Sequence, residues 1–209
     1  DKYNVLGIIP EIVEPDYTYI NVMSNVHWNP TKTRDGISDI LNVQVNDSVS
    51  QWFLDEVSGF AQEMKYSRLV AVIDNAHNAI SHNDTDITLS KRITPIPFQN
   101  ISKTYQFNNA IVKNTFVSNS FLNVSNQAIS FKDNGNGLID EYIANVKTTN
   151  AIGSINYQTG EVILYQYAFE VYPDTYIELT ATPQEKDVFN SHNSLNILGH
   201  LTLTSEKTT

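Results

Sequence analysis

Two stretches of the chain alternate between apolar and polar residues with the period of a β-strand. From Tyr17 to Trp28, aromatic and β-branched residues recur at every second position, and Asn29-Pro30 ends the run. A second alternation runs from Asp84 to Pro95, and one of its faces carries Ile87, Leu89, Lys91 and Ile93. The pattern therefore predicts a strand in each stretch.

Between these strands the apolar residues recur every three or four positions, which is typical of an amphipathic helix. We expect this helix to begin at Thr33 or Asp35, whose side chains can cap it, and to end between Glu56 and Gly59. A second, shorter helix is predicted from Lys65 to His77. The apolar face of the first helix consists of Ile37, Leu41, Val45, Val49, Trp52 and Phe53. A succession of strand, helix, helix and strand predicts a small α/β unit with both helices on one face of a sheet.

After Pro95-Ile96-Pro97 the pattern changes to short β-prone runs separated by Asn, Gly, Asp and Ser. The predicted strands are 104–111, 115–122, 127–132, 138–146, 154–157, 161–169, 175–182 and 195–204. We therefore predict an α+β fold with two domains. Residues 1–97 form an α/β unit with an extended lead-in over 4–15, and residues 98–209 form an antiparallel, sandwich-like β-rich domain.

The clearest local signal lies between Gly153 and Tyr167. Two runs rich in Ile, Val and Tyr flank Gln158, Thr159 and Gly160, and the glycine can adopt the positive φ that a tight turn requires. This segment predicts a β-hairpin. It contains no reactive group.

Composition and charge narrow the classes of function. The 209 residues include 13 basic and 23 acidic side chains, and the formal net charge of -10 argues against a surface that neutralises nucleic-acid phosphates. The absence of cysteine excludes disulfides and a thiolate nucleophile. No apolar run reaches the roughly 20 residues that span a bilayer, so we expect a soluble chain with no membrane partner. Asp1 is not an initiator methionine, which suggests a fragment of a longer protein.

The segment from Asp133 to Asp140 resembles a calcium loop, because oxygen-bearing side chains alternate around glycines. The register does not fit, however. If Gly137 takes the glycine position of an EF-hand loop, then Lys132 and Ile143 occupy the first and last ligand positions. A hairpin turn that uses the Asn-Gly pairs is therefore the preferred interpretation, with an ion there as the alternative.

No set of residues predicts a catalytic, cofactor-binding or metal site. The five histidines lack metal-ligand spacing and are expected on the surface or in loops; they are His27, His77, His82, His192 and His200. Nucleophile-elbow, Walker and dinucleotide glycine motifs are absent. The neighbouring acids Asp55/Glu56 and Asp140/Glu141 point away from each other on a helix or strand, so neither pair forms a glycosidase site.

Two groups of aromatic residues are either core or contact surface. Trp52 and Phe53 continue the apolar stripe of the first helix, which favours core packing over a partner anchor. The tyrosines at positions 157, 165, 167 and 172 could form a binding platform, although strand packing is the preferred interpretation.

Several segments occur in an order that resembles the C-terminal part of the T4-type phage baseplate wedge protein, the gene product six family. The first part of the series is Tyr17-Thr-Tyr-Ile-Asn-Val, a long helix, residues 67–77 and residues 87–92. Its second part is Tyr105-Gln-Phe-Asn-Asn-Ala-Ile, Ser118-Asn-Ser-Phe, Gly153-Ser-Ile-Asn-Tyr, Glu161-Val-Ile-Leu, Ile177-Glu-Leu-Thr-Ala-Thr-Pro, Asp187-Val-Phe and Ser194-Leu-Asn-Ile-Leu. The resemblance spans roughly residues 10 to 205.

The resemblance implies a structural, non-enzymatic protein of a contractile tail, found in the virion and assembled in the bacterial host cytoplasm. It also implies that the chain binds copies of itself, as a homodimer or ring, and other wedge proteins, and that it needs no cofactor. The alternative is a carbohydrate-binding β module of a tail fibre or adhesin, with the tyrosines as its platform. A hydrolase with two distant carboxylates is a third class.

Overall fold

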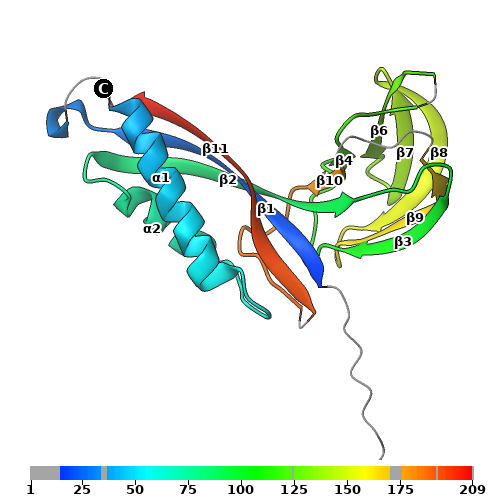
Figure 1. Cartoon of the computed structure of the whole chain (residues 1–209), viewed down its shortest axis with the longest axis horizontal. Helices are drawn as coiled ribbons and strands as arrows, with labels where there is room; N and C mark the ends of the chain where they lie inside the picture. Colours follow the sequence, from blue (N-terminus) through cyan, green and yellow to red (C-terminus); the bar gives the residue numbers. More distant parts are fainter. Residues whose placement is uncertain (1–14, 34–36, 124, 170–175, 192, 209) are drawn as a thin grey trace, which may run out of the picture.

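Three long strands and two helices form one end of the molecule, which we call the helical lobe (Figure 1). The computed structural model describes residues 15–33, 37–123, 125–169, 176–191 and 193–208. In the helical lobe the strands are β1 (Asp16–Trp28), β2 (Ile80–Ile93) and β11 (Ser194–Lys207). β2 is antiparallel to β1, and β11 is parallel to β1 on its other side. This three-stranded layer unites the two ends of the described chain.

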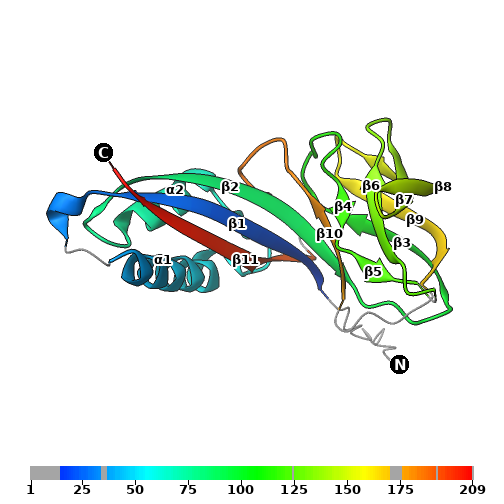
Figure 2. The same ribbon diagram turned by 90° about the horizontal axis from the view of Figure 1, so that it is seen from above.

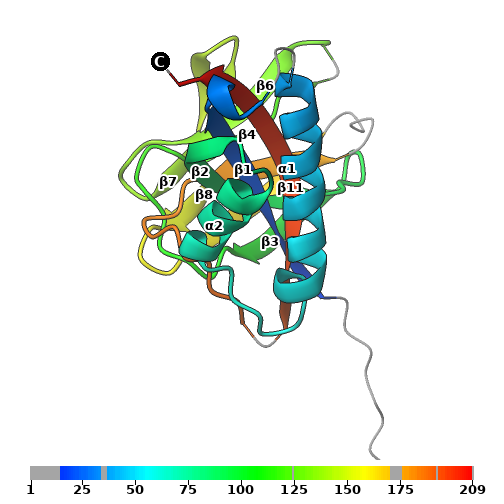
Figure 3. The ribbon, with the colours of Figure 1, turned by 90° about the vertical axis from the view of Figure 1, so that its left-hand side faces the viewer.

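The helices α1 (Ser38–Trp52) and α2 (Tyr66–Asn75) cover one face of this layer, α1 over β11 and α2 over β2 (Figures 2 and 3). The predicted apolar stripe is buried at Leu41, Val45, Val49 and Trp52. A π-helical turn, Phe53–Val57, extends α1 to the end that the sequence predicts. The start differs, because the helix begins at Ser38 without a side-chain cap; Asp35 lies outside the described residues.

The second end, the β lobe, is built from short strands that curl around an aromatic core (Figure 1). These strands are β3 (Asn100–Gln106), β4 (Val117–Ser118), β5 (Phe121–Leu122), β6 (Ala128–Asp133), β7 (Leu138–Ile143), β8 (Val146–Asn156), β9 (Glu161–Ala168) and β10 (Ile177–Ala181). Phe131 makes edge-to-face or tilted contacts with Phe121, Tyr167 and Phe169 at ring-centroid distances of 5.2, 4.9 and 6.1 Å. Phe121, Phe131 and Phe169 are buried, so these rings form part of the core of the β lobe.

The predicted α+β class is wrong. All strands belong to one 11-stranded sheet in the order β11-β1-β2-β10-β4-β6-β7-β8-β9-β3, with β5 paired to β6. The two α-helices of the described residues are additions to a mostly β protein, and the second half is a curled continuation of the same sheet instead of a sandwich of two sheets. The prediction failed because the β2–β10 and β1–β11 pairings join residues that are far apart in sequence, which local periodicity cannot reveal.

Several local predictions are confirmed. Both strands of the first half are present, and Ile87, Leu89, Lys91 and Ile93 all lie buried on one face of β2. The hairpin of β8 and β9 pairs Asn156 with Glu161 around the expected turn. The lead-in over 4–15 falls almost wholly outside the described residues, and the domain division after residue 97 stays a prediction. Among the described residues, no helix is long and apolar enough to cross a membrane.

The hairpin turn yields a first testable prediction. Gly160 has a φ of +70°, and a Cβ added there would lie 2.3 Å from the carbonyl oxygen of Asn109. We expect Gly160→Ala to lower the free energy of unfolding by about 1–3 kcal/mol, because the new methyl group strains the turn and pushes on backbone. Chemical denaturation measures the loss.

Gly59→Ala is the matched control for this substitution. Gly59 does not have a positive φ, and its added Cβ would meet the flexible side chain of Gln62 at 2.8 Å. An equal or larger loss of stability in the control would contradict the argument for Gly160.

Candidate functional site

The outer edge of β11 is the most prominent unpaired element of the described structure. β11 pairs with β1 along one side, and at its start the loop after α1 contacts the other side through a Phe60–Leu195 bridge. No other strand of the described chain pairs with residues 197–207. The stretch from Leu201 to Ser205 contains neither charge nor proline, the two devices that commonly protect a sheet edge from pairing.

Val43 of α1 lies beside this edge, and Ile40 is three residues earlier on the same side of the helix. Ile40 and Val43 are 55% and 59% exposed, which the binary pattern of the helix did not predict. A groove of about 380 Å³ separates the helix from the strand; it is lined by Asn42, Val43, Asn46, Asp47, Leu201 and Leu203. We call the edge of residues 197–207, together with Ile40 and Val43, the edge surface. It combines unpaired backbone groups with apolar side chains, as strand-addition interfaces do.

A β-bulge sets the register of β11 just before the uncharged stretch. The pairing with β1 shifts between Ile20 and Val22, and there the backbone N–H of His200 donates to the side-chain oxygen of Asn21 at 2.9 Å. A Cβ at Gly199 would lie 2.1 Å from that oxygen. A larger residue at position 199 would therefore have to displace the Asn21 side chain from its hydrogen bond with His200.

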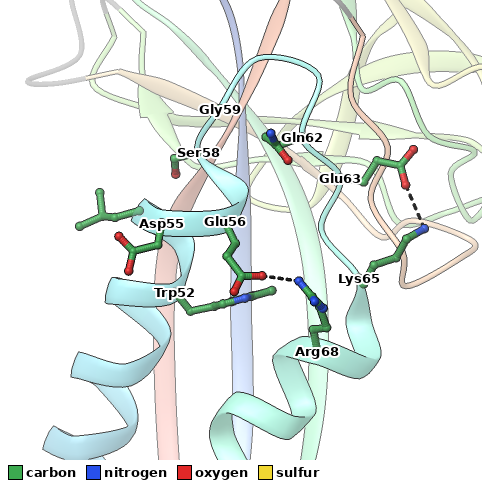
Figure 4. Close-up of a pocket in the computed structure, with 10 residues that line it drawn as sticks. Trp52, Asp55, Glu56, Ser58, Gly59, Gln62, Glu63, Lys65 and Arg68 are labelled. Carbon is green, nitrogen blue, oxygen red and sulfur yellow. Dashed lines mark hydrogen bonds and ion pairs between the residues drawn. The ribbon is translucent and has the colours of Figure 1, made fainter.

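The connection between α1 and α2 encloses a cavity of about 400 Å³ (Figure 4). Four of its charged residues form ion pairs: Arg68 contacts Glu56, and Lys65 lies 3.0 Å from Glu63 and also 3.3 Å from Asp187. Lys65 donates hydrogen bonds to the carboxylates of Glu63 and Asp187, and these bonds raise the pKa of Lys65. These contacts hold the connection in place and leave the cavity without a reactive constellation among its lining residues.

Asp55 and Glu56 serve different partners, as expected for neighbours on a helix. Gln51 donates to Asp55 at 3.0 Å, whereas Glu56 faces Arg68. The two carboxylates therefore do not converge on a common point.

The segment from Asp133 to Asp140 forms the turn between β6 and β7. The Asn134 side chain accepts the N–H groups of Asn136 and Leu138, which closes the turn. The carboxylate of Asp133 turns inward, where it accepts the backbone N–H groups of Asn114 and Phe116 at 2.8 and 3.0 Å. The turn interpretation thus agrees with the geometry, and Asp133 connects the β6–β7 hairpin to the segment before β4.

The adjacent acids Asp140 and Glu141 also separate. Asp140 is buried beside Lys147 at 2.6 Å. Burial by itself would raise its pKa, but hydrogen bonds from Lys147 and the Ala151 N–H lower it below its ordinary value. Glu141 accepts the hydroxyl of Tyr167 at 2.5 Å. Asp140 thus links β7 to β8, and Glu141 links β7 to β9.

The aromatic candidates divide between core and surface. Trp52 and Phe53 are buried and pack edge to face with ring centroids 5.3 Å apart, which confirms the core interpretation. Tyr165 is 46% exposed, Tyr167 packs against Phe131, and position 172 lies outside the described residues. The described tyrosines therefore do not share one exposed platform.

The histidines occupy different environments. His77 accepts the Ala79 N–H at 3.0 Å, and His200 lies 3.1 Å from Glu178. His27 and His82, which are 55 residues apart in sequence, stack on each other, and sequence spacing did not predict this pair. Position 192 lies outside the described residues. The pair could have been predicted only from the register of β1 and β2, in which His27 and His82 are partners.

Tyr157 provides a testable consequence of the Asp133 contacts. Its hydroxyl donates to Asp133 at 2.6 Å, and burial together with this hydrogen bond raises its pKa to about 12 from 10.0. Between these two values the folded state binds more protons than the unfolded state, so the free energy of unfolding falls as the pH rises. We expect Tyr157→Phe to reduce this slope relative to the unmodified chain in denaturation series below pH 10 and near pH 12.

Tyr165→Phe is the control, since that side chain is exposed and lies outside the Asp133 contacts. The assignment is wrong if both substitutions change the slope by the same amount, or if Tyr157→Phe leaves it unchanged.

Two comparisons with known proteins match parts of this chain. The family model described as baseplate structural protein gp6, C-terminal domain III, matches residues 16–92, which run from the start of β1 to within β2. The baseplate wedge protein gp6 of Enterobacteria phage T4 is 23% identical over 137 residues, a match that covers 64% of this chain and 20% of the T4 protein. These similarities support a structural role in a phage baseplate. Together they show that residues 16–92 are similar to C-terminal domain III of gp6, and that the chain matches about a fifth of the length of the T4 protein.

Proposed function

We propose that this chain is a structural component of a phage baseplate wedge that binds a second copy of itself through the edge surface. The observation that supports this most directly is the unpaired, uncharged stretch of β11 beside exposed apolar residues of α1. The proposed location is the tail baseplate of the virion, after assembly in the host cytoplasm. We also propose that the chain binds other wedge proteins and that it is not an enzyme.

A second copy suits this surface because a strand edge is self-complementary. Two β11 strands related by a two-fold axis perpendicular to the sheet can pair in antiparallel orientation, and each then satisfies the open backbone groups of the other. The same axis keeps both α1 helices on one face of the joined sheet. Ile40 and Val43 of each copy then lie next to the new strand pair, where burial of their exposed side chains adds to the backbone hydrogen bonds.

The distribution of charge favours self-association through the uncharged part of β11 over binding to a charged polymer. The chain has a net charge of -10, so two copies repel each other at long range. The stretch from Leu201 to Ser205 is uncharged, and it thus offers a place where two acidic molecules can approach. We expect self-association to strengthen as salt is added, because screening reduces the repulsion.

Substitutions on the edge surface test the proposal. Val43→Asp places a carboxylate beside the groove, and Thr202→Lys places a charge on the exposed edge. We expect each to weaken dimerisation by at least about tenfold, or about 1.4 kcal/mol, because charges would have to be desolvated at the interface. Sedimentation equilibrium of the purified chain measures the dissociation constant.

Val146→Asp is the matched control, since Val146 is 66% exposed and lies in the β lobe. The control should dimerise like the unmodified chain. A chain that stays monomeric at high concentration, or a control that loses dimerisation equally, would refute the proposed interface.

A further inference from the structure

The face of the helical lobe opposite α1 and α2 carries a concentrated group of metal-ligating side chains. Ile20, Val22, Ser24, Val26 and Trp28 of β1 are buried toward the helices, so the alternate residues point to the open face. His27 pairs with His82 directly across the β1–β2 ladder, and Asn25 pairs with Asp84. Two imidazoles and a carboxylate therefore project from adjacent rows of one sheet face.

The geometry brings the three ligand atoms together. The His27 Nε2 lies 3.1 Å from the Asp84 Oδ2, and all three ligand atoms lie within 4.8 Å of one another. A tetrahedral zinc ion with bonds of about 2.0–2.1 Å needs ligand atoms about 3.3 Å apart. His82 and Asp84 are exposed, so side-chain rotation can close this difference without a change in the backbone.

An ion pair alone accounts for only part of this arrangement. His27 and Asp84 could form a simple ion pair, but His82 stacks on His27 with ring centroids 4.3 Å apart and an interplanar angle of 7°. A neutral imidazole has a lone pair on one nitrogen and can bind a metal ion.

Side chains of β1 and β11 lie next to these ligands. The Thr204 hydroxyl donates to the Asn25 side chain at 2.9 Å, and the Asn25 amide lies 3.4 Å from the His27 Nε2. Glu206 is the register partner of His27 on β11 and is exposed. The site thus lies between Asp84 and a further carboxylate, which favours a cation over an anion.

We propose that His27, His82 and Asp84 bind one divalent transition-metal ion of the zinc class and that this ion fastens β1 to β2. Two nitrogen donors and one carboxylate suit Zn²⁺, Co²⁺, Ni²⁺ or Cu²⁺ better than the oxygen-seeking Ca²⁺ or Mg²⁺. Three protein ligands leave a fourth position for water or for a side chain such as Glu206. The exposed side of the site gives the ion a path of entry.

Titration of the purified, tag-free chain with Zn²⁺ tests this inference. Isothermal titration calorimetry should show one ion per chain, and the thermal midpoint should rise with Zn²⁺ concentration, because the ion binds only the paired strands. Even the outer partner of a ligand changes metal affinity by about 10–100-fold, so His82→Ala should weaken binding by at least about tenfold and reduce the thermal shift at a given Zn²⁺ concentration. Asp84→Asn should weaken binding in the same direction.

His200→Ala is the matched control, because His200 is also an exposed histidine next to a carboxylate but lies away from the three ligands. The control should keep both the affinity and the thermal shift. The proposal is overturned if the unmodified chain does not bind Zn²⁺, if His82→Ala binds it unchanged, or if Mg²⁺ produces the same thermal shift. Co²⁺ provides an independent readout, since tetrahedral coordination by His27 and His82 would produce visible absorption that His82→Ala loses.

Discussion

The pairing of β2 with two different neighbours is the constraint on which the rest of the molecule depends. Residues 80–90 of β2 pair with β1, and residues 89–93 pair with β10, so one strand belongs to both lobes. Leu89 and Ser90 have register partners in both β1 and β10, so the sheet passes from one lobe to the other through these two residues. At this crossing Lys91 is buried, and its ammonium group donates to Asp16 at 2.9 Å and Thr18 at 2.8 Å. Burial lowers the pKa of Lys91, and the Asp16 carboxylate opposes that shift.

This arrangement determines which surfaces remain open. Both helices lie on one face of β11, β1 and β2, and the opposite face carries the exposed Met23 as well as the stacked His27 and His82. Because β11 is the last strand of the sheet, its outer backbone groups have no partner strand in the described chain beyond residue 197. The proposed assembly contact lies on the strand edge, and the three ligands of the proposed metal site lie on the sheet face; Glu206 of β11 belongs to both regions. They can be tested separately.

The internal contacts explain why the polar residues that first drew interest do not form a reactive centre. Asp133 accepts two backbone N–H groups and the Tyr157 hydroxyl, and Asp140 is paired with Lys147. Each buried carboxylate is thus used to connect strands, since an unpaired buried charge would destabilise the fold.

The sequence by itself determined the local elements: the strands flanking the helices, the buried stripe from Leu41 to Trp52, and the turn at Gly160. These follow from periodicity and backbone preference, which act between near neighbours. Only the tertiary structure decided that all strands share one sheet, that β11 returns to lie parallel to β1, and that His27 faces His82. The physical reason is that strand pairing depends on backbone hydrogen bonds between distant residues, and these bonds carry little side-chain signature.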